Sequence, residues 1–130
     1  MDTKTTEHIY SLQPILAVPD IVQTVGFYRT VLGFAVDFIY GDPPTHAAVF
    51  QGEWSCEGAR IQFTHANQDH MQIPTDWLYF FVLEDIDSLF ARYVVGGAKV
   101  IFAPELHLWD MRECTITDRN GYLLRFGIAI

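Results

Sequence analysis

The segment that decides the fold is WLYFFVLEDIDSLFARYVVGGAKVIF, residues 77–102, because QPILAVPDIVQTVGFYRTVLGFAVDF, residues 13–38, repeats its pattern. An offset of 64 positions aligns similar residues: Val18 with Val82, Asp20 with Glu84, Val22 with Ile86, Val25 with Leu89 and Gly33 with Gly97. Each segment has the pattern of a strand, an acidic cap, an amphipathic helix, a glycine and a further strand. The chain therefore contains a diverged internal repeat.

The first helix is expected from about Ile21 to Val31, with Asp20 as its N-cap and Gly33 just past its end. Its apolar stripe is expected at Val22, Val25 and Leu32.

The second helix is expected to be capped by Asp85 or Asp87 and to end at Gly96–Gly97. Its stripe is expected to consist of Ile86, Leu89, Phe90 and Tyr93.

Three strands are expected after each helix. They are residues 35–40, 47–51 and 60–65 in the first copy, and residues 99–102, 112–117 and 123–128 in the second. The segments GDPP (41–44) and DRNG (118–121) are turn signals, and HANQDH (65–70) and PELHLWDMRE (104–113) are expected to be loops. The pattern predicts an α+β fold in one domain, with two βαβββ modules at about 10–66 and 77–128. We expect curved mixed sheets around a cleft, with the helices outside.

Composition excludes several classes of protein. The net charge of −8 disfavours binding to nucleic acid, whose phosphates need a basic surface. The same charge would attract cationic ligands, or it could simply keep the protein soluble. No apolar stretch approaches the roughly 20 residues of a membrane span. The first residues lack the apolar run of a signal peptide, so we expect a cytoplasmic protein in which Cys56 and Cys114 are reduced thiols.

Residues 14–34, PILAVPDIVQTVGFYRTVLGF, resemble the opening of the vicinal-oxygen-chelate superfamily, which includes glyoxalase I, extradiol dioxygenases and bleomycin-resistance proteins. That opening consists of a strand, an aspartate, a helix with FY and then LGF. Residues 103–127, APELHLWDMRECTITDRNGYLLRFG, resemble the end of bleomycin-resistance proteins, with its tryptophan loop, DPDG-like turn and final strand ending in LLRF. The resemblance extends from about Leu12 to Gly127 and implies the fold described above.

Metalloenzymes of this superfamily hold a divalent ion with four side chains, typically His and Glu. The resemblance carries these positions onto Gln13, Gln62, Trp77 and Arg125. Tryptophan offers no lone pair, an arginine cation repels a metal, and glutamines are weak ligands. We therefore expect no metal at these positions and no cofactor.

Other chemistry finds little support in the sequence. The five histidines are His8, His46, His65, His70 and His107, and none of their spacings is that of a metal site. There is no glycine-rich phosphate loop, no GxSxG elbow, and no base beside either cysteine that would mark a nucleophile. The sequence favours a protein that is not an enzyme.

The cleft lining follows from strand alternation. If Gln13, Gln62, Trp77 and Arg125 face inward, Ile15, Thr64, Tyr79 and Leu123 do too. This surface suits a large, flat, partly aromatic ligand. Alternatively, Trp77 and Tyr79 could fill the core of a closed domain.

Three further residues are candidates for ligand binding. The resemblance implies that Trp109 helps to form the drug-binding groove, although a dimer contact is the competing interpretation. Phe38 and Asp37 match family positions where a ring stacks on the drug and an acid faces its cationic parts. Phe38 could equally be a core residue, and Asp37 an ordinary solvated acid.

The resemblance also implies a homodimer with ligand clefts at its interface and an exchanged N-terminal strand. Pro14 matches a family proline associated with that exchange, or it is simply a strand-edge proline. The leading hypothesis is a non-catalytic, metal-free protein that sequesters a bleomycin-like or other cationic aromatic antibiotic. The alternatives are a glyoxalase- or dioxygenase-type enzyme with a relocated metal site, and a family member that binds another metabolite.

Overall fold

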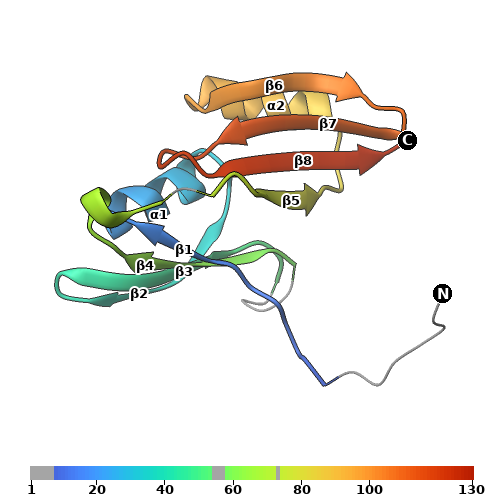
Figure 1. Ribbon diagram of the computed structural model, residues 1–130. Coiled ribbons are helices and arrows are strands. Elements are labelled where there is room, and N and C mark those ends of the chain that lie inside the picture. Colours follow the sequence, from blue (N-terminus) through green and yellow to red (C-terminus); the bar gives the residue numbers. More distant parts are fainter. Residues whose placement is uncertain (1–7, 54–57, 73) are drawn as a thin grey trace.

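The computed structural model describes residues 8–53, 58–72 and 74–130 (Figure 1). The first half contains β1 (Ile15–Val18), α1 (Ile21–Thr30), β2 (Ala35–Gly41), β3 (Pro44–Phe50) and β4 (Arg60–His65), followed by a short 3-10 helix (Gln68–His70). The second half contains β5 (Trp77–Phe81), α2 (Ile86–Val95), β6 (Lys99–Leu106), β7 (Met111–Thr117) and β8 (Leu123–Ala129). This arrangement confirms the two predicted βαβββ modules.

Each module forms its own mixed sheet of four strands. Sheet A has the order β1-β4-β3-β2 and sheet B the order β5-β8-β7-β6. The first strand of each module pairs in parallel with its last strand, and the remaining pairs are antiparallel. The helix of each module covers one face of its sheet, and the opposite face is left open (Figure 1).

The helix caps follow the sequence closely. The Asp20 side chain accepts a hydrogen bond from the Gln23 amide, and the Asp85 side chain accepts one from the Ser88 amide. Of the two predicted caps for the second helix, Asp85 is therefore the one used. Gly33 and Gly97 take positive φ angles of 78° and 93° after the helix ends, which glycine adopts without a steric penalty.

The stripe predicted for the first helix was wrong at Val22, which is exposed. The buried positions are Ile21, Thr24, Val25 and Tyr28, spaced so that they share the helix face that is turned toward the sheet, and Val22 lies outside that face. In α2, Ile86, Leu89 and Tyr93 are buried as predicted.

Three segment boundaries also differ from prediction. β3 begins at Pro44, within the expected turn, and residues 68–70 of the expected HANQDH loop form a 3-10 helix. β6 continues through Pro104 to Leu106 because it is an edge strand of sheet B, where a missing amide proton costs no ladder bond.

One hydrophobic core joins the two modules. Its buried residues include Tyr28 and Phe63 from the first module and Leu124 and Phe126 from the second. The turn between β7 and β8 fastens the modules together: the Tyr28 hydroxyl donates to Asp118 at 2.8 Å, and the Tyr122 hydroxyl donates to the Ala17 carbonyl at 2.7 Å. Burial raises the pKa of the Asp118 carboxyl, against the lowering effect of the hydrogen bonds it accepts.

Cys114 is a buried free thiol in this core, and desolvation raises its pKa to about 11. Cys56 lies outside the described residues. In the described part of the chain, no helix is long and apolar enough to cross a bilayer.

Candidate functional site

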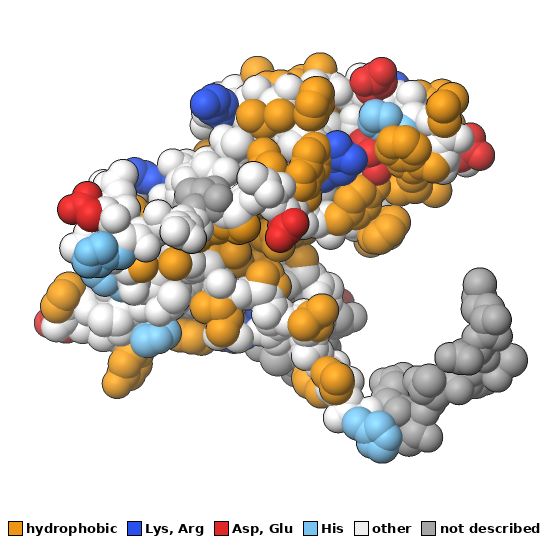
Figure 2. Space-filling model, viewed as in Figure 1, with side chains coloured by type: hydrophobic (Ala, Val, Ile, Leu, Met, Phe, Trp, Pro, Cys, Tyr) orange, Lys and Arg blue, Asp and Glu red, His pale blue; other side chains and the backbone are white. Residues whose placement is uncertain are grey.

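The face of sheet B opposite α2, called here the open face of sheet B, carries the predicted cleft residues of the second module. Strand register places Trp77 beside Leu123, and Tyr79 beside Arg125, Thr115 and then Phe102. A further row runs from Phe81 through Gly127 and Glu113 to Glu105. Hydrophobic side chains gather on the second module and in the hollow between the two modules (Figure 2).

A buried carboxylate organises this face. Glu113 is only 3% exposed, and four side chains surround its carboxylate. The Tyr79 hydroxyl donates to its Oε2, as does the Trp109 indole at 3.4 Å. Arg125 Nη1 and His107 Nε2 each lie 3.4 Å from its Oε1. A buried carboxylate needs such partners, so these four side chains are held in one fixed arrangement.

Tyr79 reaches Glu113 by passing over the intervening strand at Gly127. A Cβ atom at that position would lie 2.0 Å from the Tyr79 hydroxyl oxygen and 3.2 Å from Glu113 Cγ. Desolvation raises the pKa of Tyr79 to about 12, with the hydrogen bond to Glu113 as the second cause. Tyr79 therefore remains a hydrogen-bond donor to a higher pH than an ordinary tyrosine does.

The aromatic side chains of this face are partly exposed. Trp77 and Tyr79 are 38% and 39% exposed, which supports cleft positions over the alternative that they fill the core. The Arg125 guanidinium lies 3.7 Å from the centroid of the Trp77 ring, and the Phe102 ring is nearly parallel to that ring at 6.4 Å. Together they present flat surfaces of the kind that binds planar groups, and the Arg125 guanidinium already occupies the position of a cation over the Trp77 ring.

Trp109 lies in the turn between β6 and β7, as predicted, and is 58% exposed. Its indole stacks on the His107 ring with centroids 4.4 Å apart and an interplanar angle of 2°. A cavity of about 100 Å³ opens beside this stack. Its lining residues are Phe102, Glu105, His107, Glu113, Thr115 and Arg125.

On the open face of sheet A, strand register puts Phe38, Ala48, Gln62 and Ile15 in one row, with Thr64 two residues beyond Gln62. Phe38 is 39% exposed, so it is not a core residue. Asp37 forms an ion pair with Arg60 at 2.6 Å, and its charge is therefore compensated within the sheet.

The four positions implied for a metal fall into two contacting pairs. Gln62 donates to the Gln13 carbonyl oxygen at 3.0 Å in sheet A, and Arg125 covers Trp77 in sheet B. The Gln13 oxygen also accepts a bond from Arg60. These residues do not fit a divalent ion, because Trp77 and Arg125 offer no lone pair, the Gln13 side-chain oxygen is already hydrogen-bonded, and glutamine oxygens are weak ligands.

Several residues of this face were missed from the sequence, above all Glu113 and Phe102. The signal was present in part: alternation along MRECTIT puts Glu113 and Thr115 on one face, and the short DRNG turn sets them opposite Gly127 and Arg125. Phe102 could not be placed in this way because the β6–β7 pairing contains register shifts.

A family profile described as the glyoxalase/bleomycin resistance protein/dioxygenase superfamily matches residues 7–126. The chain belongs to this superfamily, as its repeat and sequence motifs predicted. The superfamily's description spans both enzymes and resistance proteins. No curated protein matches the chain.

Solved structures share the fold at low sequence identity. TioX from Micromonospora sp. ML1 is 18% identical with a TM-score of 0.74, and the match covers 92% of this chain and 98% of that one. A glyoxalase-related enzyme from Clostridium phytofermentans is 22% identical with a TM-score of 0.75, covering 98% and 100%. A family enzyme from Burkholderia phytofirmans PsJN is 19% identical with a TM-score of 0.70, covering 91% and 97%.

Proposed function

We propose that this protein is a metal-free, non-catalytic binding protein that sequesters a planar, aromatic, cationic compound of the bleomycin type, as a member of the resistance branch of its superfamily. The observation that carries the proposal is the Glu113 cluster, which holds Tyr79 and Trp109 on the open face of sheet B by hydrogen bonds. Side chains fixed before the ligand arrives lose little conformational entropy on binding.

The acidic contact for such a ligand is best assigned to Glu105. Glu113 and Arg125 compensate each other, and Asp37 is paired with Arg60. Glu105 lines the small cavity beside Phe102 and His107 and has no hydrogen-bond or ion-pair partner among the described residues. A compact cationic group in this cavity would meet a carboxylate and the face of a ring.

Sequestration also favours a dimer, in which the open face of sheet B forms a cleft with a second copy. β1 pairs with β4 of its own chain, and Gln13 still contacts that strand, but residues 8–12 run away from both sheets (Figure 1). Ile9, Tyr10 and Leu12 in this segment are 78%, 87% and 95% exposed. Apolar side chains this exposed are suited to contact a partner, so exchange of the N-terminal segment remains our proposal.

Titration calorimetry with bleomycin tests the function. We expect saturable heat with one ligand per chain, a strong loss of affinity in Trp109→Ala, and partial recovery in Trp109→Phe, which keeps a ring. No heat at micromolar protein would exclude bleomycin as the ligand. Unchanged binding in Trp109→Ala would exclude this face as its site.

The competing proposal is an enzyme with a relocated metal. Glu105, His107 and Glu113 are of the right residue types, but across residues 8–53, 58–72 and 74–130 no group of three or more such side chains is arranged to hold an ion. Elemental analysis after incubation with zinc, manganese and nickel salts decides between the two. Stoichiometric, tightly held metal would overturn the binding-protein proposal.

A further inference from the structure

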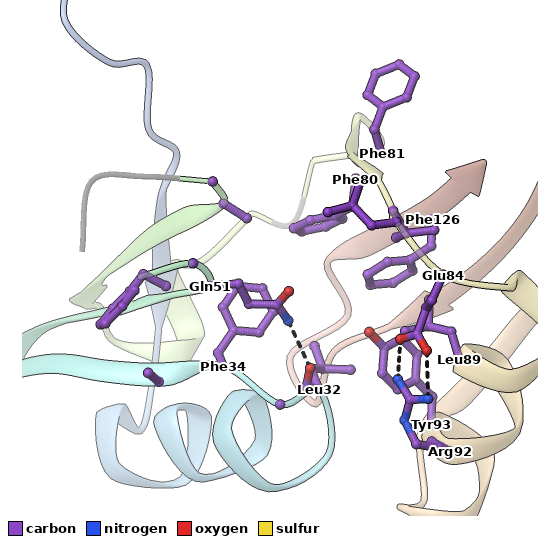
Figure 3. Close-up of a pocket in the computed structure, with 18 of the residues that line it drawn as sticks. Leu32, Phe34, Gln51, Phe80, Phe81, Glu84, Leu89, Arg92, Tyr93 and Phe126 are labelled. Carbon is purple, nitrogen blue, oxygen red and sulfur yellow. Dashed lines mark hydrogen bonds and ion pairs between the residues drawn. The ribbon is translucent and has the colours of Figure 1, made fainter. Parts of the chain in front are cut away.

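A separate and much larger cavity, of about 860 Å³, lies between the two modules. Its walls come from the end of β3 and the start of β2 on one side, and from β5, α2 and β8 on the other (Figure 3). Phe34 and Phe80 meet edge to face from opposite modules, with ring centroids 6.3 Å apart. The volume lies within the range of about 300–1,000 Å³ that is typical of small-molecule sites.

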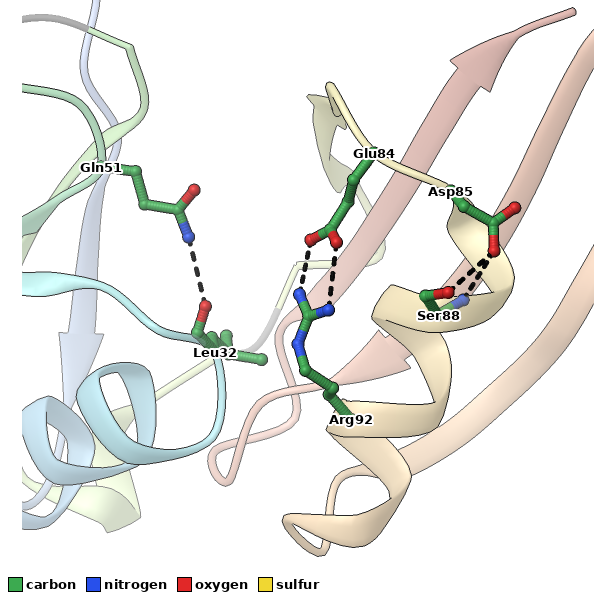
Figure 4. Close-up of polar contacts among 6 residues, drawn as sticks. All are labelled: Leu32, Gln51, Glu84, Asp85, Ser88 and Arg92. Atoms are coloured by element: carbon green, nitrogen blue, oxygen red, sulfur yellow. Dashed lines mark hydrogen bonds and ion pairs between the residues drawn. The ribbon is translucent and has the colours of Figure 1, made fainter.

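Among the described residues of its wall, the cavity carries no uncompensated charge. Arg92 on α2 donates two hydrogen bonds to Glu84, one of them at 3.0 Å, so the two charges neutralise each other (Figure 4). The remaining walls are mostly aromatic and aliphatic, with Tyr93, Phe126 and Leu89 on one side and Leu32 on the other. A neutral and largely apolar occupant matches this lining.

The Tyr93 hydroxyl is a polar group in the cavity that bonds to no described residue. Tyr93 is only 2% exposed, and its hydroxyl has no hydrogen-bond partner among the described residues. Figure 3 shows this hydroxyl directed into the cavity from α2. The hydroxyl is therefore available to donate a hydrogen bond to a ligand oxygen in the cavity. Across the cavity, the Gln51 amide nitrogen donates to the Leu32 carbonyl, and the amide oxygen accepts no bond from a described residue.

We propose that the cavity between the modules is a second small-molecule site, for a neutral, ring-bearing compound with one hydroxyl or carbonyl oxygen that accepts the hydrogen bond of Tyr93. This site is distinct from the one proposed for the cationic ligand on the open face of sheet B, although Tyr79 lines this cavity as well as that face. Judged from the described residues, the two differ in charge preference: one carries the Glu105 carboxylate without an ion-pair partner, and in the other Arg92 and Glu84 pair with each other.

Naphthol and naphthalene are matched probes for this site, because they differ by one hydroxyl group. Amide NMR spectra of the isotope-labelled protein should show that both shift residues around the cavity, including Gln51 and Tyr93. Naphthol should bind about 3- to 10-fold more tightly than naphthalene, the range expected for one neutral hydrogen bond. In Tyr93→Phe this preference should vanish while naphthalene affinity is retained.

Two further variants separate the sites. Ala35 lines the cavity from the exposed start of β2, so Ala35→Trp should occupy part of the space and weaken binding of both probes. Trp77→Ala alters the open face of sheet B and should leave naphthol binding unchanged. Probe shifts confined to the open face, or an undiminished naphthol preference in a folded Tyr93→Phe protein, would overturn the proposal.

Discussion

The hydroxyl of Tyr79 on β5 donates a hydrogen bond to the carboxylate of Glu113 on β7, across the full width of β8. This contact exists because the residue beneath the tyrosine ring, Gly127, has no side chain. It connects the edge strand of sheet B to the interior of the open face and fixes the aromatic surface on which the proposed function depends.

Gly127→Ala should therefore break the contact. The new methyl group would take the place of the Tyr79 hydroxyl, and the half-exposed tyrosine would turn outward toward solvent. Its pKa should fall from about 12 toward the ordinary value of 10.0. A pH titration of tyrosinate absorbance, compared with that of Tyr79→Phe, measures this directly. An unchanged titration in Gly127→Ala would contradict the geometry.

The same pKa shift predicts how stability depends on pH. The folded-state pKa of Tyr79 is raised above its unfolded value, so its contribution to stability is complete below pH 10 and declines as the pH rises through about 12. Tyr79→Phe should remove this component of the alkaline loss of stability. Urea unfolding across the alkaline range, with the wild-type protein as reference, provides the test.

Two buried tyrosines offer a matched comparison of hydroxyl groups. Tyr28→Phe removes a hydroxyl that donates to Asp118, so we expect destabilisation of about 1–3 kcal/mol. Tyr93→Phe removes a hydroxyl with no partner among the described residues, and the free energy of unfolding should stay within about 0.5 kcal/mol. Urea denaturation measures both. Equal losses would mean that the Tyr93 hydroxyl has a partner after all.

Arg125 should matter to stability far more than Arg112. Arg125→Met leaves the buried Glu113 without its cation and should cost about 1.5–3 kcal/mol, because hydrogen bonds to charged groups are the stronger ones. Arg112→Met breaks an ion pair with Asp87 on the protein surface, where solvent screens the charges, so little change is expected. Thermal unfolding of the two variants should rank them in this order.

Glu105→Gln should weaken binding of a cationic ligand and flatten the dependence of its affinity on salt concentration, since salt screens the attraction to an exposed carboxylate. Asp69→Asn makes the same change in net charge at an exposed site in the short 3-10 helix. Calorimetry at low and high salt should detect the effect only in Glu105→Gln. Equal effects in both would indicate attraction by overall charge alone.

The sequence was sufficient for the repeat, the caps and the outward-facing rows, because these depend on local patterns. The DRNG turn and alternation along β8 placed Arg125 on the open face. The Glu113 cluster was not predicted because it joins β5, β7 and the β6–β7 turn through strand register. The cavity around Tyr93 was beyond prediction for the same kind of reason: helical spacing identifies a buried tyrosine but cannot show that its hydroxyl lacks a partner.

The turn at residues 118–121 has a consequence for folding. It belongs to the second repeat, but its side chains bond to the helix of the first repeat. The Asp118 carboxylate accepts a hydrogen bond from the Tyr28 hydroxyl, and the Asn120 amide donates one to the Thr24 hydroxyl. Separating the two halves would remove the hydrogen bond between the Tyr28 hydroxyl and the Asp118 carboxylate. The repeats resemble each other in sequence, yet they should unfold in a single cooperative transition, and neither half should be stable when expressed alone.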